Sequence, residues 1–358
     1  MLIIRDYARY KIIEKGAMIV GIDVGGANTK VATSDGSFVR LIYAPLWRNK
    51  AIISDVLADV KRRLEAEGKG IEAVGVVMTG EICGCFNTKR EGVLYIKKVV
   101  STMFGDTNFF DRDCNFKNSS YVDKDPLSFA ATNWLASAKF LSEEYKKVIF
   151  VDIGSTTTDV IPIVEGKVKA KRTDFERLKS GELIYSGVLR TGVAHLLKRV
   201  KIRGEEYMTS SELFAITADA YLALGYIRKD DYSCEKPCNY AYSFAREGED
   251  KEDKNRISAM QRLARVVCSD LEEIGEEGAV SIAEQVKETQ VEELIDSMKR
   301  IKKKYGLKGV VSAGIGDFIV KEATDSLNIK FLSLSSRYGK EISAVFPAYA
   351  VAKLLEAQ

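Results

Sequence analysis

The sequence predicts an α/β protein with two domains that flank a phosphate-binding cleft, and three observations lead to this fold class. A segment of aspartate, glycine and threonine residues follows an apolar run twice, at 23–30 and at 152–159. Each copy continues into a second apolar run and then an acidic residue followed by glycine, 12 residues after Asp23 and 13 after Asp152. A length of 358 residues is enough for two hydrophobic cores. The repeated unit therefore predicts two related domains.

The first domain is expected over 18–146, after an N-terminal extension at 1–17 that lies outside the fold. Strands are expected near 18–23, 29–34, 38–43 and 73–78, and helices over 49–68 and 126–145. Apolar residues recur at helical spacing in both helical segments, as on one buried face of a helix. The order of hairpin, crossover helix and strand is that of a mixed sheet of the ribonuclease-H type.

The second domain is expected over 147–358 and begins with the second copy of the hairpin. The expected helices cover 187–200, 210–225, 256–270, 291–305, 317–326 and 346–356, and the expected strands cover 309–316 and 331–334. Residues 226–253 are polar and irregular, and we expect a loop or a lid there. No low-complexity linker separates the two halves, so we expect the domains to pack around a shared cleft.

The two turns have the composition that phosphate binding requires. A phosphate oxygen reaches backbone N–H groups most easily where no Cβ atom intervenes, so glycine and small residues are favoured, and threonine and serine hydroxyls add donors. Gly314 and Gly316 follow a late strand and would let a ligand approach the backbone, although close packing of strand on helix explains them equally well. The candidate phosphate ligands are Gly25, Gly26, Asn28, Thr29, Lys30, Gly154, Ser155, Thr156, Thr157, Thr158, Gly314 and Gly316.

An aspartate stands at the end of the apolar run before each turn, where its charge cannot favour a phosphate. Asp23 and Asp152 would instead hold a metal ion, directly or through water, or act as a base on a water or hydroxyl group. Turn capping is the structural alternative. Asp159 is expected to hold the opposite hairpin or a metal-bound water. Oxygen ligands of this kind favour Mg²⁺ rather than Zn²⁺.

Composition excludes several classes of function. Net charge is +3 from 54 basic and 51 acidic residues, which gives no reason to expect binding to nucleic acid or to an anionic membrane. No apolar stretch approaches the roughly 18–20 residues of a transmembrane helix, and the first residues lack the apolar core of a signal peptide, so a cytoplasmic protein is expected. The six cysteines lack the doubled spacing of a zinc site and are expected to be reduced thiols. His195, the one histidine, is expected on a helix, packed or at the surface.

Several segments resemble those of known families. The two hairpins and the late strand–glycine–helix segment resemble the actin/hexokinase/Hsp70 superfamily, and within it the hydantoinase/oxoprolinase group. The chain departs from that group's motifs at Ala27, Lys30 and Ser155. With these departures it resembles a narrower archaeal family, the tetrahydromethanopterin-linked C1 transfer pathway proteins. The segments that carry this resemblance are 25–30, 78–81, 85–93, 152–159, 181–188 and 217–221.

The family includes, in methanogens, a transferase of methanofuran biosynthesis, so the resemblance implies that activity. The implied reaction joins (aminomethyl)furanmethanol diphosphate to γ-glutamyltyramine through an aryl ether and releases pyrophosphate. These two small molecules are the expected partners, and ATP is not expected to be consumed.

The implied reaction assigns roles to the candidate residues. The two turns and Lys30 would stabilise the leaving diphosphate, with Mg²⁺ held by Asp23, Asp152 or Asp159. Asp152, Asp23 or Glu81 would assist the loss of the phenol proton, because a phenol with a pKa near 10 requires a base. An anionic group, such as the carboxylates of the γ-glutamyl end, would be bound by three cations: Lys89, Arg90 and Arg190.

Two alternatives from other classes stay open. One is an ATP-dependent hydrolase or kinase of the same fold, and the other is a nucleotide-switched protein of the actin or chaperone type. Lys30 and Ser155 weigh against the kinase, because the hydantoinase-like relatives have Asp and Gly at those positions. The lack of an obvious partner-binding tail weighs against the switch.

Overall fold

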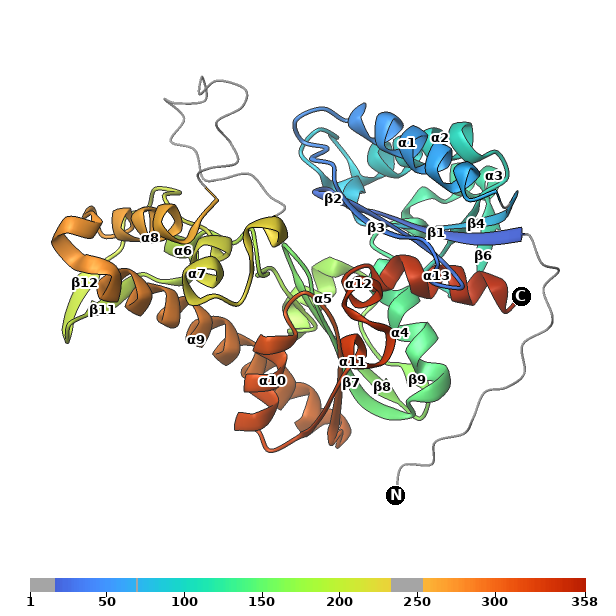
Figure 1. Ribbon diagram of the computed structural model, residues 1–358. Helices are drawn as coiled ribbons and strands as arrows, with labels where there is room; N and C mark the ends of the chain where they lie inside the picture. The colour runs from blue at the N-terminus through green and yellow to red at the C-terminus, as the bar shows by residue number, and fades with distance from the viewer. Residues whose placement is uncertain (1–16, 69, 233–253) are drawn as a thin grey trace. The chain divides into compact units, whose positions relative to one another are not determined.

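A computed structural model provides the structure of the protein (Figure 1). The described residues are 17–68, 70–232 and 254–358. Of the predicted N-terminal extension at 1–17, only Ala17 is described, and it begins the first strand. Of the predicted lid at 226–253, residues 226–232 are described, and they include the 3-10 helix η3 (Lys229–Asp231). Cys234 and Cys238 lie outside the described residues.

The chain divides into two compact units. Unit 1 contains the described residues up to Phe140 together with Pro347–Gln358, and unit 2 contains the described residues from Leu141 to Phe346. The sequence placed the boundary near 146 and assigned the C-terminal helix to the second domain, so the units differ from the predicted domains at both places. The last helix joins unit 1 because it packs directly on the first sheet, as described below.

Unit 1 is built on a six-stranded mixed sheet with the order β3-β2-β1-β4-β5-β6. Its strands are β1 (Ala17–Val24), β2 (Asn28–Thr33), β3 (Val39–Tyr43), β4 (Gly70–Met78), β5 (Asn108–Phe110) and β6 (Phe116–Asn118). Strands β1 and β2 form an antiparallel hairpin, and β1 pairs with β4 in parallel. This arrangement confirms the predicted hairpin, crossover helix and parallel strand.

Both faces of the first sheet are covered. The α-helices of unit 1 are α1 (Ile52–Ala66), α2 (Lys89–Phe104), α3 (Ser119–Lys124), α4 (Asn133–Glu144), which continues past the unit boundary at Phe140, and α13 (Phe346–Glu356), whose first residue belongs to unit 2. The 3-10 helices of unit 1 are η1 (Gly80–Ile82) and η2 (Pro126–Phe129). Val20 and Ile22 of β1 share a core with Leu57 of α1, whereas Gly21 points to the opposite face. A Cβ atom at Gly21 would lie 1.9 Å from the carbonyl oxygen of Ala348, so the backbone of α13 rests on β1.

Unit 2 repeats this design in a sheet with the order β10-β8-β7-β13-β14. Its strands are β7 (Lys147–Ile153), β8 (Thr158–Val164), β9 (Lys167–Val168), β10 (Leu183–Ile184), β13 (Gly309–Gly314) and β14 (Lys330–Ser333). The hairpin β7–β8 is antiparallel, and β13 pairs with β7 in parallel. Two sheets with the same hairpin-plus-parallel order confirm the fold class of two ribonuclease-H-like domains.

Alternate residues of β7 serve two cores. Ile149, Val151 and Ile153 pack with the helices of one face, and the ring of Phe150 lies 6.2 Å from that of Phe346 on the other. The helices of unit 2 are α5 (Asp174–Ser180), α6 (Val193–Leu196), α7 (Thr217–Leu224), α8 (Arg256–Arg265), α9 (Leu271–Tyr305), α10 (Asp317–Ser326), α11 (Leu334–Tyr338) and α12 (Lys340–Ala344). Helix α9 begins 20 residues before the predicted segment at 291–305, and Gly275 (φ 69°) breaks its helical geometry near the start.

Two predicted helices of unit 2 are wrong. The segment 187–200 contains only the short α6, and its end enters a hairpin of β11 (Arg199–Ile202) and β12 (Glu205–Met208). The segment 210–225 is helical only in α7. In β11 the buried side chains alternate with exposed ones, which is the period of a strand rather than of a helix.

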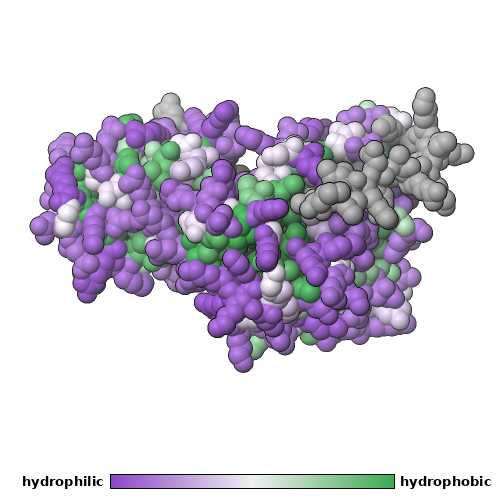
Figure 2. All heavy atoms as spheres, turned by 90° about the horizontal axis from the view of Figure 1, so that it is seen from below, coloured by the Kyte–Doolittle hydropathy of each residue, from purple (hydrophilic) through white to green (hydrophobic). Residues whose placement is uncertain are grey.

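Polar and charged side chains cover most of the molecular face in Figure 2, with apolar side chains gathered in smaller patches. Within the part of the chain that the structure describes, no helix combines the length and the apolar character needed to cross a membrane.

Candidate functional site

The first hairpin turn places glycine where backbone atoms come close together. The N–H of Gly25 donates to the carbonyl oxygen of Asn28 at 3.0 Å, and a Cβ atom at Gly25 would lie 2.7 Å from that oxygen. At Gly26 a Cβ atom would meet only the side chain of Cys83, at 3.9 Å or more. The turn is therefore tight at Gly25 and open at Gly26.

Asp23 and Lys30 form an ion pair at this turn. They are cross-strand partners in β1 and β2, and Lys30 Nζ lies 3.3 Å from Asp23 Oδ2. Asp23 is 1% exposed, and its second oxygen, Oδ1, has no hydrogen-bond partner among the described residues. Burial raises the pKa of the Asp23 carboxyl, and the Lys30 ammonium opposes that shift in part. A buried carboxylate with a raised pKa is common at functional sites, and the role of Asp23 as a base or metal ligand stays a prediction.

Other predicted phosphate ligands of the first turn are less accessible. Thr29 is fully buried, and its hydroxyl has no hydrogen-bond partner among the described residues. Asn28 is 6% exposed. A phosphate would therefore meet this turn at Gly26 more readily than at the two polar side chains.

Glu81 lies beside the first turn. The N–H of Thr79 donates to the carbonyl oxygen of Val24 at 2.9 Å, and a Cβ atom at Gly80 would lie 3.1 Å from the backbone of Gly25. Glu81 itself is buried in η1. The structure thus places the start of η1 beside the turn that follows Asp23, and the role of Glu81 as a base stays a prediction.

Lys89 and Arg90 occupy the first turn of helix α2, which Thr88 caps by accepting a hydrogen bond from the Glu91 N–H. Arg90 is exposed and Lys89 is half-buried. Both residues belong to unit 1, and their binding of an anionic group stays a prediction.

The second hairpin turn exposes its polar side chains. The N–H of Gly154 donates to the carbonyl oxygen of Thr157 at 3.0 Å, which closes the turn as at Gly25. Ser155, Thr156 and Thr157 are half-exposed. Thr158 is buried and donates to the carbonyl oxygen of Ser186 at 2.7 Å. Three of the four predicted hydroxyls are therefore partly exposed, Ser155 Oγ and Thr156 Oγ1 lie 3.4 Å apart, and the fourth hydroxyl supports the turn.

Residues 187–190 hold the second turn in place, a contact that the sequence did not predict. The N–H groups of Leu189 and Arg190 both donate to the carbonyl oxygen of Ser155 at 3.0 Å. A Cβ atom at Gly187 would lie 2.6 Å from the backbone nitrogen of Thr156. This close approach fixes Arg190 beside the second turn.

Asp152 is the last residue but one of strand β7 and lies next to Gly314. A Cβ atom at Gly314, where φ is 89°, would lie 2.5 Å from Asp152 Oδ1. A Cβ atom at Gly316 would overlap the side chain of Ile153 at 2.5 Å. Both glycines therefore let the end of β13 pack on β7, which is the structural alternative that the sequence left open.

Asp159 is the cross-strand partner of Asp152, and it forms a buried ion pair. Arg177 Nη2 donates to Asp159 Oδ1 at 2.5 Å, and Arg177 Nη1 donates to Asp174 Oδ1 at 2.8 Å. Arg177 is 1% exposed. Asp159 is therefore the ion-pair partner of a buried arginine, a contact that the sequence did not predict.

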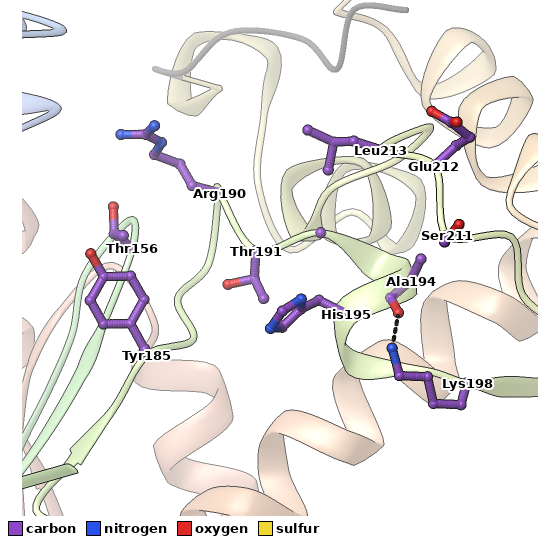
Figure 3. A pocket seen from close by; sticks show the side chains of 11 residues that line it. Thr156, Tyr185, Arg190, Thr191, Ala194, His195, Lys198, Ser211, Glu212 and Leu213 are labelled. Carbon is purple, nitrogen blue, oxygen red and sulfur yellow. Dashed lines mark hydrogen bonds between the residues drawn. The ribbon is translucent and has the colours of Figure 1, made fainter. Parts of the chain in front are cut away.

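A pocket of about 320 Å³ opens beside the second turn (Figure 3). It is lined by Thr156, Tyr185, Arg190, Thr191, Gly192, Ala194, His195, Lys198, Ser211, Glu212 and Leu213. Thr156 and Arg190 were predicted ligands, and the pocket brings them together. His195 was expected to be packed or at the surface of a helix; it lies in the short α6 and its ring points into the pocket.

The remaining lining residues could not be found from the sequence by spacing. Tyr185 and Lys198 belong to separate segments without a periodic pattern, and Ser211, Glu212 and Leu213 come from the loop before α7. The one signal in the sequence was that Tyr185 stands in the family-like segment 181–188.

Among the described residues, no three His, Cys, Asp or Glu side chains gather as a metal site. Mg²⁺ requires fewer protein ligands, because it commonly binds one or two carboxylates together with substrate phosphates. The unpartnered Oδ1 of Asp23 fits such a role.

Comparisons with known proteins give consistent matches. The hydantoinase/oxoprolinase family profile matches residues 72–358. A (4-{4-[2-(gamma-L-glutamylamino)ethyl]phenoxymethyl}furan-2-yl)methanamine synthase of Methanocaldococcus jannaschii is 38% identical over 345 residues, which cover 95% of this chain and 98% of that protein. A protein of the same name from Methanococcus vannielii is 37% identical over 224 residues, 61% of this chain and 96% of its own length.

Solved structures resemble the chain at much lower identity. A ROK family glucokinase from Streptomyces griseus, solved with glucose and AMPPNP, has a TM-score of 0.47 and 12% identity, covering 94% of this chain and 98% of that one. The strand order of the two sheets, rather than this resemblance, supports the fold class of two ribonuclease-H-like domains.

Proposed function

Because the chain belongs to the hydantoinase/oxoprolinase family, and its methanogen relatives are synthases of one aryl ether, we propose that it catalyses formation of that ether in methanofuran biosynthesis. The product is (4-{4-[2-(gamma-L-glutamylamino)ethyl]phenoxymethyl}furan-2-yl)methanamine. The substrates are (aminomethyl)furanmethanol diphosphate and γ-glutamyltyramine, and pyrophosphate is released. The observation that carries the proposal is 38% identity over 95% of this chain and 98% of the relative.

The reaction forms one C–O bond and breaks another. The phenol oxygen bonds to the furfuryl carbon, the bond from that carbon to the diphosphate oxygen breaks, and the phenol loses its proton. The furan oxygen shares positive charge with the furfuryl carbon, so negative charge develops on the leaving diphosphate early. Donors aimed at the diphosphate are therefore the main catalytic requirement.

The second turn and its neighbours supply such donors. Ser155, Thr156 and Thr157 present half-exposed hydroxyls, and Arg190 lines the same pocket as Thr156. A guanidinium can bind two diphosphate oxygens at once, which stabilises the leaving group as its charge grows. In unit 1, Lys30 is the cation of the first turn, where it is paired with Asp23.

A base must accept the phenol proton, and the strand-end carboxylates are the candidates. Asp23 has the stronger support, because burial raises its pKa and a more basic carboxylate accepts a proton more readily. Asp152 and Glu81 are alternatives at the second turn and beside the first turn. Mg²⁺ bound to the diphosphate through Asp23 or Asp152 would neutralise charge on the leaving group.

The alternative function is an ATP-dependent hydrolase or kinase of the hydantoinase/oxoprolinase type, favoured by the family match alone. Phosphorus NMR separates the two. The purified protein is incubated with the furan diphosphate and γ-glutamyltyramine without ATP, and in parallel with ATP alone. We expect pyrophosphate in the first sample and neither ADP nor phosphate in the second. Release of pyrophosphate only when ATP is hydrolysed would contradict the proposal.

A further inference from the structure

The pocket beside the second turn contains charges of both signs. The side of the pocket away from the second turn carries Lys198 and Glu212, which are both exposed. Figure 3 shows Lys198 next to Ala194 of α6 and Glu212 on the segment before α7. The Lys198 ammonium donates to the Ala194 carbonyl oxygen at 3.2 Å, which uses one of its three N–H groups. Two further donors can therefore serve a ligand.

Glu212 is the one carboxylate among the pocket-lining residues that the structure describes. A carboxylate disfavours a diphosphate, because like charges at short range repel. It favours an ammonium group. Lys198 and Glu212 together match a ligand that carries both a carboxylate and an ammonium, as the zwitterion of an α-amino acid does.

The side of the pocket next to the second turn suits an aromatic part of such a ligand. Tyr185 and Thr156 lie together at the side of the second turn, and Arg190 reaches over from the loop that holds that turn (Figure 3). An aromatic ring packs well against Tyr185. A phenol placed there would face the turn proposed to bind the diphosphate. The pocket volume of about 320 Å³ lies at the lower end of the roughly 300–1,000 Å³ that small-ligand sites span.

We propose that this pocket recognises the zwitterionic glutamyl head of the phenolic acceptor, with Lys198 binding its α-carboxylate and Glu212 its α-ammonium. The assignment rests on the proposed function, because that function supplies the acceptor. Arg190 then lies at the end of the pocket next to the second turn. Lys198 and Glu212, at the other end, give specificity for a γ-glutamyl amide over a free amine.

Steady-state kinetics of Lys198→Gln and Glu212→Gln test the assignment with two acceptors, γ-glutamyltyramine and tyramine. Each variant loses one charge-assisted hydrogen bond to the glutamyl head, so we expect its KM for γ-glutamyltyramine to rise about tenfold or more. The KM for tyramine and the KM for the furan diphosphate are expected to stay at wild-type values. The matched controls Lys201→Gln and Glu205→Gln change the same residue types on the neighbouring β11–β12 hairpin, outside the pocket lining.

Two kinetic outcomes overturn the assignment. In one, both variants keep the wild-type KM for γ-glutamyltyramine. In the other, the KM for the furan diphosphate rises instead, which would give the pocket to the donor.

Calorimetry separates this proposal from the proposed function. γ-Glutamyltyramine is titrated into the wild type and both variants with pyrophosphate present. Binding that is about tenfold weaker in each variant supports the pocket assignment even if the wild type forms no ether, in which case only the proposed function fails. Equal binding by variants and wild type, or no binding by the wild type, overturns the assignment whether or not the ether forms.

Discussion

Lys30 Nζ lies 3.3 Å from Asp23 Oδ2, and this ion pair joins the ends of β1 and β2 at the first phosphate-type turn. The two partners differ in burial: the side chain of Asp23 is 2% exposed and that of Lys30 is 19% exposed. The carboxylate therefore loses more hydration than the ammonium. Ionised Asp23 is therefore expected to cost stability even with Lys30 as its partner.

Asp23→Asn is expected to stabilise the fold at neutral pH. Burial raises the folded-state pKa of Asp23 above its ordinary 3.8, so the folded state holds this proton more tightly than the unfolded state does. Ionised Asp23 thus lowers the free energy of unfolding at pH values above both pKa values, and the penalty fades as pH falls toward 3.8. Urea unfolding at several pH values should show the largest gain near pH 7 and a smaller one near pH 4. A variant less stable than wild type at pH 7 would contradict this reasoning.

Lys30→Met is expected to destabilise the fold, because it leaves the buried Asp23 carboxylate without its ion partner. Loss of one partner of a buried pair costs about 3–5 kcal/mol, and partial exposure of Lys30 reduces this to about 2 kcal/mol. The double variant Asp23→Asn/Lys30→Met should recover most of that loss. Additive effects in this double-mutant cycle would show that the two side chains do not interact.

Asp152→Asn is expected to lower kcat at least about 10²-fold, the usual scale for loss of an acid–base or metal-holding carboxylate. The melting temperature should change little, because the side chain lies at a strand end beside Gly314. Asp325→Asn, an exposed position on α10, serves as the matched control and should keep wild-type activity. Near-normal turnover by Asp152→Asn would leave turn capping as its role.

Gly187→Ala is expected to impair the second turn. The added Cβ would lie 2.6 Å from the Thr156 nitrogen, and backbone atoms at that distance must move. Overpacking of this kind costs typically about 1–3 kcal/mol. We expect a lower melting temperature and a higher KM for the furan diphosphate. At Gly309 an added Cβ meets only Val148 at 3.6 Å, so Gly309→Ala should resemble wild type in both measurements.

Turnover is expected to require Mg²⁺. The described residues offer no dense metal site, so the ion should join together with the diphosphate and be absent from the purified protein. EDTA should abolish pyrophosphate release, and Mg²⁺ or Mn²⁺ should restore it. Stoichiometric zinc by elemental analysis, lost together with activity, would instead assign a metal role to the cysteines.

Local sequence patterns were sufficient for much of the fold. The helices predicted at 317–326 and 346–356 have the same bounds in α10 and α13, because their apolar residues recur at helical spacing. The repeated strand–turn–strand segments predicted both hairpins, with Asp23 and Asp152 at their strand ends. These features depend on residues close together in the chain.

The sequence was less informative where the spacing of apolar residues fits both a helix and a strand. Apolar residues between 187 and 225 suggested long helices, but buried Val200 and Ile202 belong to a hairpin strand. Spacing alone separates these cases poorly in short segments, and packing against α9 decides the outcome.

The sequence by itself determined the two phosphate-type turns, the strand-end carboxylates and the family-like segments. Only the tertiary structure paired Asp159 with Arg177, brought Gly187 against Thr156, and gathered Lys198 and Glu212 around one pocket. The physical reason is that a turn is specified by neighbouring residues, through glycine geometry and hydrogen bonds across a few positions. A pocket is specified by side chains from distant loops, whose convergence depends on how the elements between them pack.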